Sequence, residues 1–265
     1  MLSGVKDTLY IPLYARIYAS KKFPEFFYDQ KALELEKFIK MESEGIQKSS
    51  EYSLLASVAR YYYFDKIVKD FINKNPQGNI INLGCGLDTL CERSGNKTAT
   101  FYAVDFPETI SVREEILKPN DNETLIASDI ESDEWINKVD LKKPTLAILS
   151  GVFQYFHEDE VLAFIKKIQE KFANIEIAFD ATNKTGISYA NKYVKKTGNK
   201  NAMMYFYVND PEAFAKKCGA VLLKTNTFFI DMRKALKHKL HFITRLFMAV
   251  VDKKKRAIIV YLKLN

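Results

Sequence analysis

The sequence predicts an α/β fold with a doubly wound, mostly parallel sheet of seven strands, an antiparallel edge and a helical N-terminal extension. Two observations lead to this expectation. From Asn79 to Phe179, short apolar runs alternate with helical segments, which is typical of parallel strands joined by right-handed crossovers. Residues 1–75 show helical spacing instead, and residues 210–265 hold two further strand-like runs that fit an antiparallel edge.

The N-terminal part is predicted to be a helical lid over residues 1–75, within one structural domain whose remainder, residues 76–265, binds the cofactor. Leu9, Leu13 and Ile17 recur every four residues, as on one face of a helix. Further helices are expected from Gln30, capped by Asp29, to about Lys40, and over Ser53–Phe71.

The remaining elements follow from the alternation of apolar and amphipathic runs. Parallel strands are predicted at Ile80–Leu83, Thr100–Val104, Thr124–Ala127, Thr145–Leu149 and Ile175–Phe179. Helices are predicted at Leu87–Glu92, Pro107–Leu117, Asp133–Val139, Glu158–Phe172 and Asp210–Gly219. The antiparallel edge is predicted at Val221–Phe229 and Ala257–Leu262, joined by a helix over Lys234–Val250. The polar, aromatic run Gly186–Asn201 is expected to be a lid or substrate loop.

A glycine turn follows the first predicted strand. Gly84 and Gly86 let a ligand approach the backbone because they carry no Cβ. Asp105 follows the second strand, where a carboxylate can accept hydrogen bonds from both ribose hydroxyls. The usual dinucleotide turn has a third glycine where this chain has Thr89, which argues against NAD or FAD and favours a phosphate-free cofactor such as S-adenosylmethionine. The alternatives are an ordinary βα turn and, for Asp105, the cap of a helix.

Further candidates follow the third and fourth strands, at the edge where open α/β sheets bind ligands. Asp129 could accept a hydrogen bond from an adenine amino group while Ile130 packs on the ring, or Asp129 could only stabilise a turn. Tyr155 and His157 could orient or deprotonate a substrate. The alternatives are packing for Tyr155 and a surface position at the start of a helix for His157.

Two other segments need a partner. Arg60 lies in an apolar, aromatic stretch, so its charge requires an anion, either a cofactor carboxylate or an acid in a structural ion pair. Leu240–Val251 is an apolar helix that could form a membrane or dimer surface, although packing into the core is the default expectation.

Bulk composition excludes several classes of protein. Hydrophobic residues make up 47% of the 265 and charged residues 28%, as in a folded chain with a sizeable core. Three scattered cysteines and three histidines argue against a disulfide framework and against a metal site. No apolar run reaches the ~18–20 residues that span a bilayer, and the first residues lack a signal-peptide pattern, so a cytoplasmic protein is expected.

The net charge of +7 allows contact with nucleic acid, acidic lipid or an anionic substrate, or only a lysine-rich soluble surface. The lysines are dispersed apart from Lys253–Arg256, which favours the soluble surface. Nucleic acid is therefore not expected as a partner, and the sequence does not predict an oligomeric state.

Taken together, several segments resemble the leucine carboxyl methyltransferase-like family. This S-adenosylmethionine-dependent group includes polyketide O-methyltransferases, a protein phosphatase carboxyl methyltransferase and a tRNA-wybutosine enzyme. The segments similar to its cofactor turn, its ribose strand and its carboxylate-binding helix are Ile81–Thr89, Tyr102–Pro107 and Ala59–Ile72. Thr8–Arg16 and Phe27–Asp29 resemble the bacterial polyketide O-methyltransferase branch, and the resemblance weakens after about Ala181.

The resemblance implies the Rossmann-like fold of class I methyltransferases, with S-adenosylmethionine as cofactor and S-adenosylhomocysteine as product. The residues that it implies for the cofactor are Arg60 at the carboxylate, Gly84 and Gly86 at the methionine portion, Asp105 and Phe106 at the ribose, Asp129 and Ile130 at the adenine, and Ser150. Many members have an acid where this chain has Ser150, so that contact is missing or replaced.

The predicted reaction is methyl transfer to a hydroxyl or carboxylate oxygen of a small molecule. A carboxylate needs no deprotonation at neutral pH, whereas an alcohol or phenol benefits from a base. Two alternatives stay open. One is methylation of a protein C-terminal carboxylate or a tRNA, which the positive charge favours. The other is a protein that binds S-adenosylmethionine without turnover, which the missing acid at Ser150 motivates.

Overall fold

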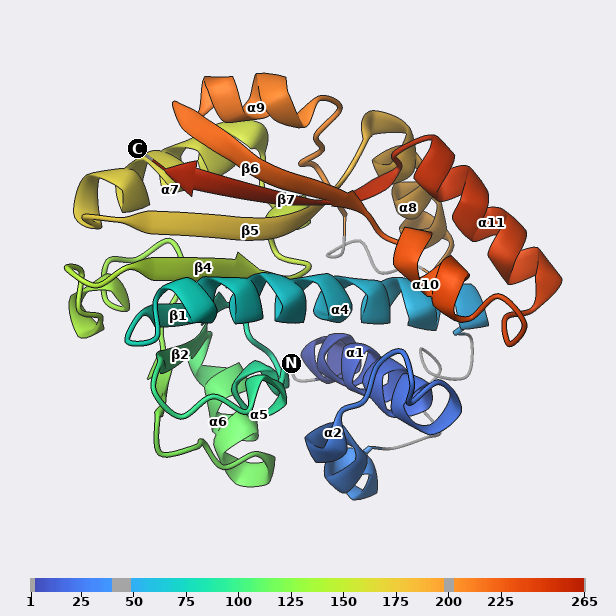
Figure 1. Cartoon of the computed structure of the whole chain (residues 1–265), viewed down its shortest axis with the longest axis horizontal. Helices are drawn as coiled ribbons and strands as arrows, with labels where there is room; N and C mark the ends of the chain where they lie inside the picture. The colour runs from blue at the N-terminus through green and yellow to red at the C-terminus, as the bar shows by residue number, and fades with distance from the viewer. Residues whose placement is uncertain (1–2, 40–48, 198–202, 265) are drawn as a thin grey trace.

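The computed structural model describes residues 3–39, 49–197 and 203–264 (Figure 1). Its sheet has seven strands in the order β3-β2-β1-β4-β5-β7-β6. The pairings are parallel except those of β7, which runs antiparallel to β5 and β6. The strands are β1 (Asn79–Leu83), β2 (Thr100–Asp105), β3 (Glu123–Ala127), β4 (Thr145–Leu149), β5 (Ile175–Thr182), β6 (Ala220–Thr227) and β7 (Ala257–Leu264). The predicted mostly parallel sheet with an antiparallel edge is confirmed.

Helices cover both faces of this sheet. Helix α4 (Glu51–Lys74) crosses one face with α1 (Ser3–Lys22) alongside it, and Phe64 of α4 packs in one cluster with strand residues (Figure 1). On the opposite face, α7 (Glu158–Lys171) buries Phe164 among other strand side chains. The remaining α-helices are α2 (Gln30–Glu34), α5 (Leu90–Ser94), α6 (Pro107–Ile116), α8 (Lys184–Thr197), α9 (Pro211–Lys217), α10 (Ile230–Ala235) and α11 (Phe242–Lys253). The doubly wound architecture is therefore confirmed.

The strand order reverses at β1, whose neighbours are β2 on one side and β4 on the other. Loops that leave β1 and β4 go to opposite faces, which opens a crevice beyond the carboxyl ends of the strands. Ser50 begins α4, because its Oγ accepts a hydrogen bond from the Ser53 N–H at 3.1 Å.

Three predicted elements are wrong. The run Gly186–Asn201 is not a loop as far as Thr197, since it belongs to α8, which starts where the Asn183 carboxamide accepts from the Gly186 N–H at 2.8 Å. Residues 198–201 lie outside the described residues. The run Lys234–Val250 forms two helices, α10 and α11, because Leu236 and Leu240 both turn into the core between them.

The third wrong element is the helix predicted over Asp133–Val139, since this segment contains only the 3-10 turn Ile136–Lys138. The Trp135 indole N–H donates to the Ile130 carbonyl at 2.9 Å and holds the segment in this conformation. Helix boundaries also move. The helix predicted from Leu87 begins at Leu90, and the one predicted over Gln30–Lys40 is α-helical only to Glu34, followed by the 3-10 turn Leu35–Phe38. Lys40 itself lies outside the described residues.

Candidate active site

A cavity of ≈ 560 Å³ lies at the carboxyl edge of the sheet, where β1, β2, β3 and β4 end. Helices α1 and α4 complete its wall through Leu9, Pro12 and Arg60 among others. Its volume lies within the range of about 300–1,000 Å³ that is typical of small-molecule sites. Eight of the ten predicted site residues line it: Arg60, Gly84, Gly86, Asp105, Phe106, Ile130, Ser150 and Tyr155.

The turn after β1 is tied to the end of β2. The N–H groups of Gly84 and Cys85 both donate to the Val104 carbonyl, at 2.8 and 3.1 Å. Gly84 and Gly86 have φ angles of 67° and 49°, which strain any residue with a side chain. A Cβ on Gly84 would also lie 2.5 Å from Cγ2 of Val152. The turn therefore presents bare backbone to the cavity.

Asp105 is fixed by the same turn. Its Oδ2 accepts from the Gly86 N–H and its Oδ1 from the Phe106 N–H, both at 2.8 Å. Burial raises the pKa of the carboxyl, and these two hydrogen bonds oppose that rise. Each oxygen keeps a second lone pair, so the carboxylate can also accept from a pair of hydroxyls. The alternative role as a helix cap does not hold, because Phe106 occupies the cap position of α6.

Buried arginines from α1, α5 and α6 form hydrogen bonds with the turn after β1, a feature that the sequence interpretation missed. Arg16 of α1 donates to the Leu87 carbonyl at 2.5 Å and pairs with Asp29 at 2.7 Å. The Thr89 hydroxyl accepts from Arg16 at 2.6 Å and donates to Asp29 at 2.6 Å. Thr89, which stands where a dinucleotide turn has glycine, is thus a buried hydrogen-bond hub.

Two more arginines continue this network. Arg93 pairs with Asp88 at 2.6 Å, and Arg113 donates to the Asp88 carbonyl at 2.5 Å and pairs with Glu123 at 2.8 Å. Burial opposes the charge of Arg93, but Asp65 and Asp88 outweigh it and hold the pKa of Arg93 well above its usual value. The Leu87 and Asp88 carbonyls therefore accept from arginines and not from helical N–H groups. This explains why helix α5 begins at Leu90 and not at the predicted Leu87.

Arg60 reaches the cavity from helix α4 and lies beside an acid of strand β5. Its Nη1 lies 3.4 Å from Oδ2 of Asp180 on β5, and the other oxygen of Asp180 accepts from the Gly151 N–H at 2.5 Å. Burial opposes the charge of Arg60, but Asp180 outweighs it and the pKa of Arg60 stays above its usual value. Many family members have an acid at the position of Ser150; in this chain Asp180 on the adjacent strand supplies a carboxylate to Arg60 instead. The only signal for Asp180 in the sequence is an aspartate within an apolar run.

The turn after β4 tests whether a polar ligand fits. The Ser150 Oγ and the Arg60 Nε are buried and have no hydrogen-bond partner among the described residues. Gly151 has φ of 72°, and a Cβ there would lie 2.4 Å from the Arg60 Nη1, so this glycine makes room for the guanidinium. A ligand with both a carboxylate and an amino group would satisfy the two orphaned atoms, because the carboxylate can accept from the Arg60 Nε–H and the ammonium can donate to the Ser150 Oγ. The residues present therefore fit the amino-acid end of S-adenosylmethionine.

The structure separates the two predicted catalytic residues. Tyr155 is 42% exposed and lines the cavity. His157 does not line the cavity. Its ring stacks on Tyr205 with centroids 4.3 Å apart, and its backbone N–H donates to the Glu160 carboxylate at the start of α7. Asp129 is also outside the lining set and accepts from the Glu131 N–H at 2.9 Å, as a turn aspartate does.

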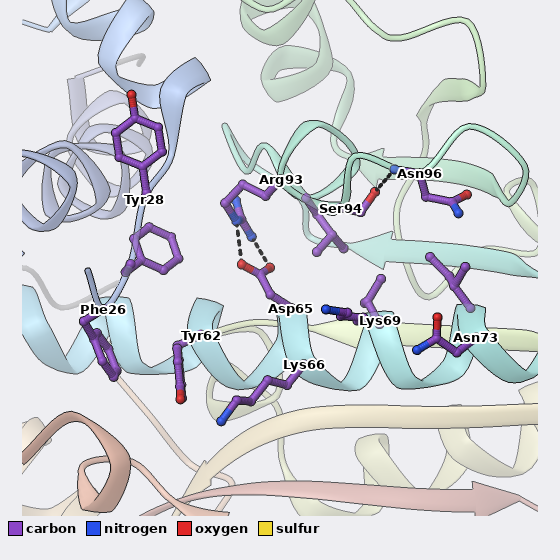
Figure 2. Close-up of a pocket in the computed structure, with 14 residues that line it drawn as sticks. Phe26, Tyr28, Tyr62, Asp65, Lys66, Lys69, Asn73, Arg93, Ser94 and Asn96 are labelled. Carbon is purple, nitrogen blue, oxygen red and sulfur yellow. Dashed lines mark hydrogen bonds and ion pairs between the residues drawn. The ribbon is translucent and has the colours of Figure 1, made fainter. Parts of the chain in front are cut away.

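A second cavity of ≈ 470 Å³ lies between α4, α5 and the segment Phe26–Tyr28 (Figure 2). Figure 2 shows Asp65 facing Arg93, which donates two hydrogen bonds to it at 2.8 and 2.9 Å. Tyr62 stacks on Phe26 with centroids 4.3 Å apart. Among the described residues, no strand end contributes to this wall and its central acid is already paired. The first cavity is therefore the candidate cofactor site.

Comparison with known proteins agrees with this geometry. The family model of leucine carboxyl methyltransferase matches residues 8–169. The tetracenomycin polyketide synthesis O-methyltransferase TcmP of Streptomyces glaucescens is 22% identical over 231 residues, covering 87% of this chain and 85% of TcmP. The S-adenosyl-L-methionine-dependent methyltransferase dpfgK of Gibberella zeae is 26% identical over 233 residues, covering 79% and 77% of the two chains.

The fold also matches that of solved structures. A DUF574 family protein from Streptomyces avermitilis superposes with a TM-score of 0.58 at 12% identity, covering 95% of this chain and 97% of the other. At that identity the likeness concerns the fold alone. The family model, by contrast, spans more than half of the sequence and includes the cofactor turn, Asp105 and Ser150. The chain therefore belongs to the leucine carboxyl methyltransferase family of S-adenosylmethionine-dependent methyltransferases.

Proposed function

We propose that the chain transfers a methyl group from S-adenosylmethionine to an oxygen atom, of a hydroxyl or a carboxylate, on a small molecule. The observation that carries this proposal is a single cavity lined by eight predicted site residues, among them the aromatic Phe106 and Tyr155, and also by Phe156. The likeness to a relative named as a polyketide O-methyltransferase supports oxygen as the acceptor atom.

The proposed cofactor contacts divide along the edge of the sheet. Arg60 and the unpartnered Ser150 hydroxyl hold the amino-acid end, and Asp105 accepts from the ribose hydroxyls. Ile130 and Phe106 pack against the rings. When bound, the cofactor supplies an electrophilic methyl group on its sulfonium.

The chain contributes mainly orientation. Methyl transfer needs the acceptor oxygen in line with the methyl group, so fixed side chains around the cavity reduce the entropy cost of reaching that geometry. Tyr155 is the proposed orienting residue, because it is the predicted catalytic side chain that lines the cavity. His157 is given no role in this proposal. A carboxylate acceptor would need no base. A hydroxyl acceptor would pass its proton to the Tyr155 hydroxyl, which would release its own proton to solvent at its exposed side.

The test supplies the purified protein with S-adenosylmethionine and a phenol, an aliphatic alcohol and an aryl carboxylate. S-adenosylhomocysteine and methylated product are measured by mass spectrometry, with Tyr155→Phe as a variant that keeps the ring. We expect product with at least one acceptor and a lower kcat/KM in the variant. A product methylated on carbon or nitrogen would contradict the oxygen assignment. Binding without turnover on any acceptor would favour the non-catalytic alternative.

One observation favours a second candidate. The description of the matching family model names a leucine carboxyl group, which is the carboxylate of a C-terminal residue. A peptide with a free C-terminal leucine and its C-terminal amide form a matched pair of substrates. Methylation of the free peptide alone would support this candidate, and methylation of neither peptide would leave the small-molecule proposal in place.

A further inference from the structure

The outward face of helix α11 is apolar and is left uncovered by the described residues. Its exposed side chains are Phe242 (79% exposed), Ile243 (66%), Leu246 (56%), Phe247 (59%) and Val250 (39%). At about 100° per residue they fall on one arc of about 140°. Met248 and Val251 lie on the other side of the helix and are buried. The expectation that Leu240–Val251 packs into the core therefore holds for the inner side of the helix and is wrong for the outer side.

The net charge of the chain gathers around this helix. Residues 230–256 hold nine Lys and Arg but only two Asp, an excess of seven, which equals the net charge of the whole sequence. Both acids are engaged, Asp231 with Lys66 and Asp252 with Arg233, each at 2.9 Å. The exposed side chains of Lys237, Lys253 and Lys254 form no ion pair with any described residue. The excess of positive charge thus lies in the sequence segment that contains α11, whereas we expected dispersed lysines. Two acids of other elements face this segment, Glu25 paired with Lys239 and Glu51 beside His241.

Helix α11 also lies at a functional edge. The antiparallel strand β7 begins at Ala257, which pairs with Thr182, the last residue of β5. The start of β7 is therefore at the carboxyl edge of the parallel strands, and α11 ends at Lys253 just before it. Figure 1 shows α11 on the outside of the molecule, at the end toward which β4 points. The apolar face thus stands on the same edge of the sheet as the cofactor cavity.

We propose that α11 docks the protein onto an anionic lipid surface. A helix with Phe and Leu on one side and a Lys-rich surround lies in the plane of a membrane interface, with its apolar side chains among the acyl chains. Unpaired lysines near such a surface are attracted to anionic headgroups. None of the helices in the described ranges could cross a bilayer, so the contact is peripheral.

Charge argues against a second copy of this chain as the occupant. A twofold contact through α11 would bring the same basic segment of both copies together, and like charges repel. An anionic membrane instead complements both properties of the face. It covers the apolar arc and supplies counter-charges for Lys237, Lys253 and Lys254. This inference does not depend on which acceptor the enzyme methylates.

The test measures co-sedimentation of the full chain with vesicles of phosphatidylcholine alone or with about one third phosphatidylglycerol. We expect binding to the anionic vesicles to be about tenfold tighter at low salt, and to weaken in about 500 mM salt because screening shortens the attraction. The double variant Phe242→Ser/Phe247→Ser should lose about tenfold in affinity, since two exposed aromatic side chains no longer insert. Its matched control, Val221→Ser/Leu223→Ser on edge strand β6, also removes two exposed apolar side chains and should bind like the wild type.

A charge variant provides an independent arm. Lys237→Glu/Lys253→Glu/Lys254→Glu should abolish the preference for anionic vesicles. Lys118→Glu/Lys138→Glu/Lys142→Glu changes the net charge equally at exposed positions elsewhere, and should retain the preference. Thermal unfolding and calorimetric cofactor binding check that each variant is folded. If the Phe242/Phe247 variant fails to fold, the charge variants decide the question.

Several results would overturn the proposal: no binding of the wild type to anionic vesicles at low salt, equal binding to both kinds of vesicle, or equal losses in the test and control variants. Sedimentation velocity addresses the competing occupant. A wild-type dimer that Phe242→Ser/Phe247→Ser dissociates, together with an absence of vesicle binding, would assign the face to a second copy of the chain.

Discussion

Substitution of Gly151 by alanine tests the proposed contribution of Arg60 to cofactor binding. Gly151 has φ of 72°, and an added Cβ would lie 2.4 Å from Nη1 and 3.3 Å from Cζ of Arg60. Because these distances are shorter than van der Waals contact, the guanidinium must leave its place beside Asp180. The backbone strain of a non-glycine residue at this φ should cost roughly 1–2 kcal/mol of folding free energy.

The effect on binding can be estimated separately from that strain. A hydrogen bond to a charged group contributes roughly 1.5–3 kcal/mol, so displacing Arg60 from the cofactor carboxylate should weaken binding by roughly 10- to 150-fold. Calorimetric titration with S-adenosylmethionine and S-adenosylhomocysteine measures this change. Both ligands carry the same carboxylate, so both should lose affinity to a similar extent.

The chain offers a matched control in Gly95, which ends α5. Gly95 has φ of 60°, and a Cβ there would meet none of the described atoms within 4 Å. Gly95→Ala should therefore lower the melting temperature through backbone strain alone while leaving the cofactor affinity unchanged. Wild-type affinity in Gly151→Ala, or an equal loss of affinity in Gly95→Ala, would refute the reasoning about Arg60.

Three further predictions follow from buried carboxyl groups. Asp105→Asn should weaken cofactor binding in calorimetry by about tenfold, since the amide keeps one acceptor oxygen of two; unchanged affinity would exclude the ribose role. Asp29→Asn should lower the free energy of unfolding in urea by about 3–5 kcal/mol at pH 7, because it removes a buried counter-charge. Burial alone would raise the pKa of Asp29, but the charges of Arg16 and Arg93 outweigh it and hold this pKa below 3.8. The stability lost in Asp29→Asn should therefore be complete above pH 3.8 and should vanish as the pH falls through the pKa of the folded state. A loss of stability that does not change with pH would contradict the ion pair. Burial raises the pKa of Glu92 from 4.5 to about 7, so the wild type loses folding stability as the pH rises between these two values. Glu92→Gln should therefore be more stable than the wild type by up to ~3 kcal/mol at pH 8, and no more stable at pH 4. Equal stabilities in urea at pH 8 would show that Glu92 is not buried in this way.

Much of the sheet could be predicted because strand signals are local. The apolar runs Asn79–Leu83 and Thr145–Leu149 are buried at every residue, and both were expected within one residue of their ends. Boundaries moved where a distant residue sets them. Helix α5 begins at Leu90 because Arg16 and Arg113 occupy the preceding carbonyls, and β5 extends to Thr182 because β7 pairs with it.

The candidate site divides in the same way. Gly84, Gly86 and Asp105 directly follow predicted strands, and a parallel sheet brings such positions to one edge whatever the details of packing. Asp180 could not be assigned to Arg60, because 120 residues separate them and an aspartate in an apolar run does not indicate its partner. The placing of His157 outside the cavity depended equally on tertiary contacts, since its ring packs on Tyr205.

The sequence by itself determined the fold class, the sheet edge that we propose for the cofactor and the residues that follow its strands, because alternation and turn chemistry are encoded by near neighbours. Only the tertiary structure decided which acid faces Arg60, what holds the turn from Leu87 to Thr89, and which side of α11 stays uncovered. The physical reason is that helical periodicity records which residues are apolar, whereas burial depends on the elements that pack against them.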